Sequence, residues 1–108
     1  MGISPLEMAS AYATFASNGW QSETTLILRV TDSQGNVLVD NTPQPRLVLD
    51  PWATASLTTV LQGVVNGGTG QAANLGDRPA AGKTGTTSSE RDVWFVGYVP
   101  QLAAAVWI

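Results

Sequence analysis

The sequence contains no cysteine and no histidine, and lysine occurs only once, at Lys83. These absences exclude disulfides, thiol catalysis, zinc sites of the usual cysteine/histidine kind and a serine–histidine–aspartate triad from these 108 residues. Acid–base chemistry must therefore come from lysine, tyrosine, aspartate or glutamate. We expect neither a metal ion nor a cofactor.

Charged residues and long apolar runs are also scarce. Only 12% of the residues are charged, the net charge is −3, and neither sign is clustered. Because a nucleic-acid surface needs a basic stripe to neutralise phosphates, we predict no nucleic-acid partner. The longest apolar runs, residues 93–99 and 102–108, are far shorter than the ~20 residues of a membrane-spanning helix. No stretch has the pattern of a signal peptide, so the sequence alone does not indicate a compartment.

The residues that are present suit a single packed domain. A chain of 108 residues that is 44% apolar can form an interior, and typical domains have roughly 100–200 residues. The last apolar run, residues 102–108, has no polar cap or turn after it. We therefore expect the natural domain to continue and residues 1–108 to be a fragment of it.

Two segments begin with helix-start signals. Residues 4–7, Ser-Pro-Leu-Glu, have the spacing of a capping box with proline at the first helical position, and they predict a helix over residues 5–17. Asn18-Gly19 would end this helix with a left-handed cap. The pair Asp50-Pro51 repeats the cap-then-proline signal and predicts a second helix over residues 52–65.

The remaining apolar segments are typical of strands. Residues 25–30 and 36–40 flank a turn-like Asp-Ser-Gln-Gly and predict a surface hairpin, and a short extended piece follows at 46–49. Three further strands, at residues 80–87, 93–99 and 102–108, would form an antiparallel sheet. The fold class is therefore α+β, with the helices packed on that sheet.

Aromatic residues suggest where the core lies. The run at residues 93–96 shows no alternation, which predicts a strand covered by helices on both faces. We expect the aromatic side chains of the strands and of the first helix to pack in the core: Tyr12, Trp94, Phe95, Tyr98 and Trp107.

The single lysine lies in Gly-Lys-Thr-Gly-Thr-Thr, residues 82–87. Gly-Lys-Thr could end a phosphate-binding P-loop, but the first glycine of that motif should stand where Asp77 is, and no buried strand precedes it. The alternative is a Lys-Thr-Gly strand at the edge of an acyl-transfer site. We favour the second interpretation.

An edge strand explains why this chemistry would need these residues. Thr84 and Thr86 would point to the same side and could offer two hydroxyls to one carboxylate, while Gly85 leaves room for a ligand. The Thr86 amide, unpaired at the edge, could stabilise a developing oxyanion. Lys83 would supply positive charge, although an ordinary solvated edge lysine remains the alternative.

Four blocks of sequence together resemble the C-terminal part of the transpeptidase domain of class A (bifunctional) penicillin-binding proteins. Lys-Thr-Gly alone is a weak signal, whereas four blocks in the order and approximate spacing of the family are a strong one. The blocks are SPLEMASAYATFASNG at residues 4–19, LQGVV at 61–65 with GTG at 68–70, AGKTGTTS at 81–88 and RDVWFVGYVP at 91–100.

The resemblance implies a D,D-transpeptidase, in which a serine attacks the penultimate D-Ala carbonyl of a peptidoglycan stem peptide. Lys83 would lie near that serine and near the second active-site serine. Thr84 and Thr86 would bind the terminal carboxylate of the stem or of a β-lactam, and the Thr86 amide would complete the oxyanion hole. The substrate-binding set implied is Lys83, Thr84, Gly85, Thr86 and Thr87, although alternation turns Thr87 to the opposite side.

The nucleophile itself is missing from the chain. No serine stands three residues before Lys83, and no S-x-N motif occurs. In the family both motifs lie N-terminal to this segment, so we expect one wall of a site, inactive alone and completed by the rest of its transpeptidase domain. The family also implies a location at the extracytoplasmic face of the bacterial plasma membrane, reached only through missing parts of the protein. A β-lactamase-type hydrolase and a non-catalytic binding module remain open.

Flanking segments have two possible roles. The glycine-rich residues 67–70 could border the site or simply end the helix. Arg91-Asp92 could orient the Lys-Thr-Gly strand, but we predict an ordinary surface ion pair.

Overall fold

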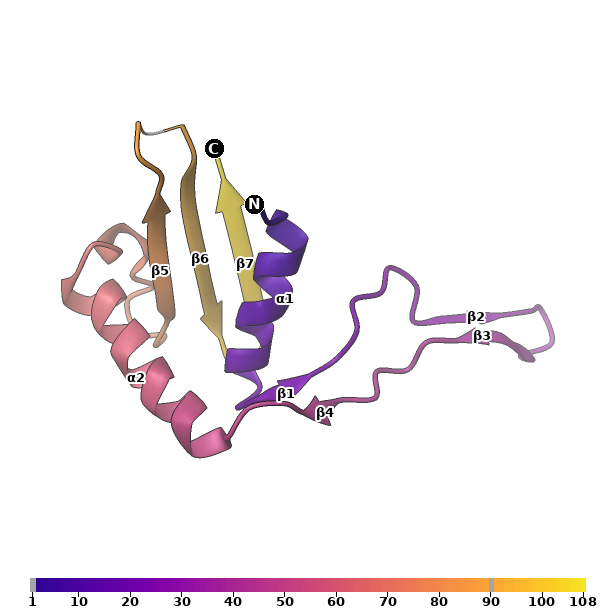
Figure 1. Ribbon diagram of the computed structural model, residues 1–108. Helices are drawn as coiled ribbons and strands as arrows, with labels where there is room; N and C mark the ends of the chain where they lie inside the picture. The colour runs from indigo at the N-terminus through magenta and orange to yellow at the C-terminus, as the bar shows by residue number, and fades with distance from the viewer. Residues whose placement is uncertain (1, 90) are drawn as a thin grey trace.

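The computed structural model, which describes residues 2–89 and 91–108, combines a three-stranded antiparallel sheet, two helices and a projecting hairpin (Figure 1). The sheet has the strand order β5-β6-β7. This arrangement confirms the predicted α+β class. The main elements are α1 (Pro5–Ala16), α2 (Pro51–Gly67), β5 (Ala81–Thr86), β6 (Val93–Val99) and β7 (Leu102–Trp107).

Both helices start at the predicted caps. The Glu7 backbone N–H donates to Ser4 Oγ at 3.1 Å, and the Ser4 hydroxyl donates back to the Glu7 carboxylate at 3.2 Å. In the usual capping box, the glutamate carboxylate accepts from the backbone N–H of the cap residue, whereas here the Glu7 carboxylate accepts from the Ser4 hydroxyl. At α2, the Trp52 N–H donates to Asp50 Oδ1 at 2.9 Å. Asn18 (φ 57°) ends α1 in the left-handed conformation, as predicted.

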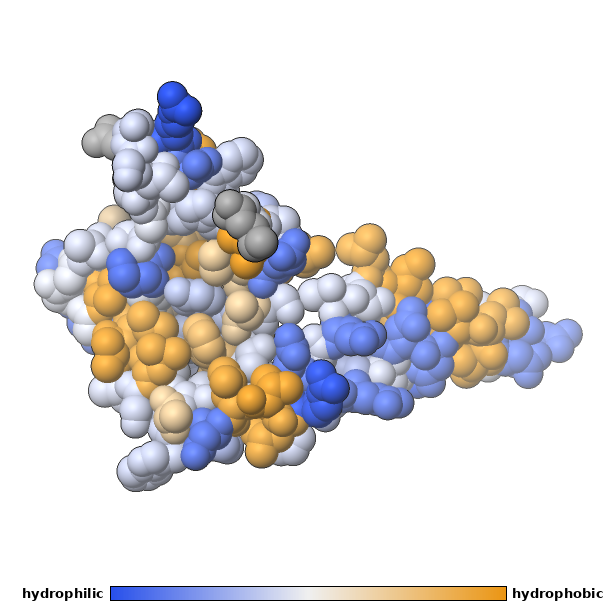
Figure 2. Space-filling view, viewed as in Figure 1, coloured by the Kyte–Doolittle hydropathy of each residue, from blue (hydrophilic) through white to orange (hydrophobic). Residues whose placement is uncertain are grey.

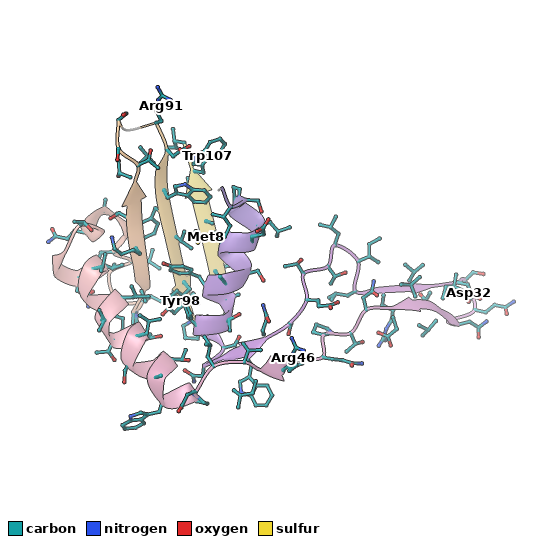
Figure 3. The ribbon with its side chains drawn as sticks, in the orientation of Figure 1. Met8, Asp32, Arg46, Arg91, Tyr98 and Trp107 are labelled. Atoms are coloured by element: carbon teal, nitrogen blue, oxygen red, sulfur yellow. The ribbon has the colours of Figure 1, made fainter. Side chains whose placement is uncertain are left out.

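Tyr98 of β6 lies where the two helices meet the sheet (Figure 3). Its ring centroid is 6.1 Å from that of Tyr12 and 6.4 Å from that of Phe15, both on α1. Its hydroxyl shares a 2.7 Å hydrogen bond with Thr58 of α2. The buried cluster around Tyr98 is completed by Leu61 and Ala81. Burial raises the pKa of Tyr98 above its ordinary value, which keeps the phenol neutral in the core.

Contact of Tyr98 with both helices corrects one prediction. Side chains alternate along a strand, so both helices reach the Tyr98 face of β6. On the opposite face, Phe95 borders a cavity that Ala73 and Leu75, from the segment after α2, also line. The run at 93–96 is apolar without being enclosed: Val93 is exposed and Phe95 half-buried. Trp107, predicted to be in the core, is 53% exposed. Its ring lies 6.3 Å from that of Trp94.

The sheet β5-β6-β7 and the two helices form the body of the structure. The projecting arm, residues 22–45, is joined to this body by a two-residue ladder between β1 (Trp20–Gln21) and β4 (Arg46–Leu47). Farther out, β2 (Arg29–Thr31) pairs with β3 (Val37–Asp40), as the predicted hairpin requires, although its first strand is shorter than expected. Figure 2 shows apolar side chains exposed along this arm. Strand β1 was not predicted.

The turn of the arm is built around Asp32 (Figure 3). One carboxylate oxygen accepts the backbone N–H groups of Gln34 and Asn36 at 2.9 and 2.8 Å. Gly35, at φ +83°, takes a backbone conformation that other residues rarely adopt. The hydrogen bonds from Asn36 hold the pKa of Asp32 below its ordinary value.

The glycine-rich segment after α2 is predicted as a loop, and the structure adds one short 3₁₀ helix, Gln71–Ala73. Within residues 2–89 and 91–108, no helix has the length and apolar character needed to cross a membrane.

Candidate functional site

Strand β5, which carries Lys-Thr-Gly, lies at one edge of the three-stranded sheet. Its pairing with β6 places Lys83 opposite Val96 and Thr84 opposite Phe95. Among the described strands, β5 therefore has the edge position that the Lys-Thr-Gly interpretation requires.

The backbone of Thr84 and Thr86 points away from β6. Val93 and Ile108 exchange both backbone hydrogen bonds, at 3.2 and 2.9 Å, so Val93 directs its N–H and C=O toward the β7 side. Because this direction alternates along an antiparallel strand, Trp94 directs its groups toward β5, where its partner is Gly85. On β5 the neighbours of Gly85 must then direct theirs outward. The Thr86 N–H therefore lies at the free edge of the sheet.

The side chains of β5 divide between its two faces. Thr84 and Thr86 stand on one face and Lys83 on the other, as the alternation predicts. The Lys83 side chain nevertheless bends around the strand edge toward Thr84. Its Nζ donates to the Thr84 carbonyl at 2.8 Å and lies 3.4 Å from Thr84 Oγ1. The ammonium and the Thr84 hydroxyl consequently meet at the strand edge.

A third hydroxyl joins this group from the loop after α2. Thr69 Oγ1 lies 3.0 Å from Thr84 Oγ1, a distance at which either atom can donate. Residues 67–70 therefore both end α2 and border the Lys-Thr-Gly strand. Thr69 itself was missed, although its place between Gly68 and Gly70 was the available signal.

The turn between β5 and β6 is fastened by Asp92. Its backbone N–H donates to Thr87 Oγ1 at 3.1 Å, and its carbonyl accepts the Thr87 N–H at 3.1 Å. Its carboxylate accepts from Trp107 Nε1 at 2.8 Å. Figure 3 shows Arg91 projecting away from the sheet, so the ion pair predicted for Arg91-Asp92 gives way to this tryptophan bond. The hydroxyl oxygen of Thr87 is thus already engaged within the turn.

The edge of β5 offers a row of hydrogen-bond donors to an anion. The row consists of the Lys83 ammonium, the hydroxyls of Thr84 and Thr86, and the outward N–H of Thr86. Lys83 and Thr86 are exposed and Thr84 is half-buried, so a ligand can reach all three. Charge-assisted hydrogen bonds to a carboxylate are stronger than neutral ones, and an outward N–H can bind a developing oxyanion.

Residues 1–108 match the family model described as the penicillin binding protein transpeptidase domain. Penicillin-binding protein 1A of Clostridium acetobutylicum is 43% identical over 108 residues, which are 99% of this chain and 13% of that protein. Penicillin-binding protein 1A of Aquifex aeolicus is 38% identical over 106 residues, 98% of this chain and 15% of that protein. The chain thus spans about one seventh of the length of these curated relatives.

Solved structures agree with these relatives. The D,D-transpeptidase domain of a peptidoglycan glycosyltransferase from Eggerthella lenta superposes with a TM-score of 0.87 at 31% identity, over 97% of this chain and 27% of that one. PonA1 from Mycobacterium tuberculosis gives a TM-score of 0.83 at 32% identity, over 95% of this chain and 28% of that one.

Proposed function

The chain belongs to the penicillin-binding protein transpeptidase family, and we propose that it forms the carboxylate- and oxyanion-binding wall of a serine-type D,D-transpeptidase. Residues 1–108 would be the C-terminal portion of the domain, and the nucleophile-bearing portion would lie elsewhere in a longer polypeptide. The observation that carries the proposal is the convergence of Lys83, Thr84 and the outward backbone of Thr86 at one open strand edge.

The proposed substrate is the D-Ala-D-Ala end of a peptidoglycan stem peptide. Its terminal carboxylate would accept hydrogen bonds from the Thr84 and Thr86 hydroxyls, while Lys83 supplies the opposite charge. This anchoring places the penultimate carbonyl beside the Thr86 N–H, which points outward from the same edge. Gly85 stands between the two threonines and adds no side chain to block the approach.

The reaction divides between this wall and the missing portion. A serine oxygen bonds to the penultimate D-Ala carbonyl carbon, the serine proton passes to the leaving amine, and the C–N bond to the terminal D-Ala breaks. The nitrogen of an amine on a second stem peptide then bonds to the acyl carbon, the bond from that carbon to the serine oxygen breaks, and a proton from the amine returns to the serine, which closes the cross-link. Lys83, near the serine, would stabilise the negative charge that develops during both steps. Residues 1–108 alone would form no acyl-enzyme.

β-Lactams would occupy the same wall, because they carry a carboxylate beside a reactive amide carbonyl. One similar structure is PonA1 of Mycobacterium tuberculosis in complex with penicillin V, at a TM-score of 0.81 and 31% identity. The proposed location is the bacterial cell envelope, at the extracytoplasmic face of the plasma membrane where stem peptides are cross-linked. We propose no role for a nucleic acid or a cofactor.

The proposal is tested by acylation of the full-length polypeptide with a fluorescent penicillin. Lys83→Ala should lower the second-order acylation rate by roughly 10- to 100-fold, the equivalent of one lost charge-assisted hydrogen bond. Arg29→Ala, which removes an exposed cation from the arm, is the matched control and should leave the rate unchanged. An unchanged rate in Lys83→Ala would count against the assignment, and rapid loss of label from the unaltered protein would indicate a β-lactamase-type hydrolase.

Thr86→Val provides a second test, because it removes a hydroxyl while keeping the shape of the side chain. We expect weaker initial binding of penicillin and an unchanged melting temperature. Loss of folding in place of weaker binding would assign Thr86 a structural role only.

A further inference from the structure

We propose that Thr69 is a positioning residue, which donates its hydroxyl hydrogen to Thr84 and so keeps the Thr84 hydrogen available for the substrate carboxylate. This inference rests on the proposed function and extends it to a residue outside the Lys-Thr-Gly motif. Three observations carry it: the fixed loop that presents Thr69, the 3.0 Å contact with Thr84, and the other donor at the Thr84 oxygen.

The loop that presents Thr69 is fastened to the last turns of α2. The backbone N–H groups of Gly68 and Gly70 both donate to the Val64 carbonyl, at 3.1 and 3.0 Å. A Cβ on Gly68 would stand 3.0 Å from Val64 Cα, and one on Gly70 would stand 3.4 Å from the Phe95 ring. Both glycines therefore allow a close approach that a larger residue would obstruct. Thr69 is thereby held between two packed positions, facing β5.

The direction of the Thr69–Thr84 hydrogen bond follows from counting donors and acceptors. A threonine hydroxyl has one hydrogen and two lone pairs, whereas an ionised carboxylate only accepts. Thr84 can bind a carboxylate only by donating its single hydrogen to it. Thr69 must then be the donor in the bond between the two threonines.

Lys83 favours the same direction of donation, from Thr69 to Thr84. Its Nζ, which has no acceptor capacity, approaches Thr84 Oγ1 at 3.4 Å. When Thr69 and Lys83 donate to the two lone pairs of Thr84 Oγ1, neither bond uses the Thr84 hydroxyl hydrogen, which can then be donated to the ligand. Hydrogen bonds in such a chain polarise one another, which makes Thr84 a better donor.

The test uses the full-length polypeptide and the concentration dependence of its acylation by a fluorescent penicillin, which separates initial binding from the acylation step. Thr69→Val keeps the shape and removes the hydroxyl, so initial binding should weaken about threefold to tenfold, the effect of one hydrogen bond. Thr69→Ser should restore binding to within about twofold, since it retains the donor. Thr59→Val, on an exposed position of α2, is the matched control and should match the unaltered protein. Should Thr69→Val fail to fold, Thr69→Ala carries the same prediction.

A double-mutant cycle with Thr84→Val separates positioning from a merely structural role. If Thr69 acts through Thr84, adding Thr69→Val to Thr84→Val should have no further effect on binding. Equal losses in the two backgrounds, or an effect-free Thr69→Val in the unaltered protein, would overturn the inference. The proposed function fails separately, if the unaltered protein takes no label or if Lys83→Ala and Thr84→Val leave its labelling unchanged.

Discussion

The body and the arm contain similar apolar residues and use them differently. In the body, Leu61, Ala81 and Tyr98 are each at least nine-tenths buried, because two helices cover one face of the sheet. In the arm, Leu26, Leu38 and their apolar neighbours remain exposed, because a two-stranded ribbon has no second layer to cover it. An apolar strand is therefore buried only where another element packs on it.

The proposed site lies on β5, in the body, and this placement suits the chemistry proposed for it. Strand β5 is held by β6 on one side, by α2 through the loop at residues 68–70, and by Asp92 at its end. Donors on such a supported strand keep their positions when a ligand arrives. The arm is shaped by local hydrogen bonds such as those at Asp32.

Tyr98→Ala should have the largest effect, because it empties the position where both helices meet the sheet. By comparison with other large-to-alanine changes in cores, we expect a loss of about 3–5 kcal/mol in the free energy of unfolding. Urea denaturation of the full-length polypeptide, followed by a fluorescence signal of the transpeptidase domain, measures it. A loss below about 1 kcal/mol would mean that this cluster does not hold the body together.

Gly82→Ala should be next, with a cost of about 1–3 kcal/mol from overpacking. The added Cβ would stand 2.7 Å from Phe95 Cζ and 2.9 Å from the Val96 carbonyl oxygen, and the carbonyl cannot move without disturbing the ladder. Gly85→Ala on the same strand is the control, since its nearest contact is 3.5 Å from Trp94 Cβ. The melting temperatures of the two variants should differ in that order, and the reverse order would refute this description of β5.

Tyr98→Phe removes only the 2.7 Å bond to Thr58 and should cost about 0.5–1.5 kcal/mol. The same urea titration measures the change. An equal loss in Thr58→Val, with no further loss in the double variant, would show that the two hydroxyls act as one pair. Additive losses would contradict that pairing.

Leu38→Ala in the arm should change the free energy of unfolding by less than about 0.5 kcal/mol, because the side chain is already 64% exposed. Limited proteolysis provides an independent readout: the arm should be cut before any site in the body. A destabilisation comparable to that of Tyr98→Ala would show that another part of the full-length protein covers the arm.

Acid should loosen the turn of the arm. The folded-state pKa of Asp32 is lowered, so its contribution is present above the ordinary carboxyl pKa and is lost as the pH falls through the lowered value. Amide resonances of Gln34 and Asn36 should shift in that acidic range in unaltered protein and show no such titration in Asp32→Asn. Shifts that persist in Asp32→Asn would assign the effect to another group.

Features that depend on a few neighbouring residues could be predicted from the sequence. Ser4 and Asp50 fixed both helix starts because a cap is a matter of a few neighbouring atoms. The hairpin turn at Asp32 and the strand at Lys83 were likewise visible in their own residues. The placement of Thr84 and Thr86 on the same face of β5 followed from the alternation of side chains along a strand.

Features that depend on distant partners could not be predicted. The contact between Thr69 and Thr84 joins two segments 15 residues apart. The glycines beside Thr69 mark its position in the sequence but do not identify Thr84 as its partner. The pairing of Trp20 with Leu47 joins the two ends of the arm. This ladder is too short to produce a recognisable strand pattern in the sequence. Trp107 pairs with Trp94 and therefore lies on the same sheet face as Tyr98. Its exposure depends on how far along the strands the helices extend, which the residues around Trp107 do not indicate.

A crystal structure of the full-length protein acylated by a penicillin would show where an anionic ligand binds on β5. We predict that the penicillin carboxylate lies within about 3 Å of the Thr84 and Thr86 hydroxyl oxygens, with the penicillin carbonyl oxygen at the Thr86 N–H. A covalent adduct whose carboxylate binds away from this strand, with Lys83 and both threonines untouched, would contradict it.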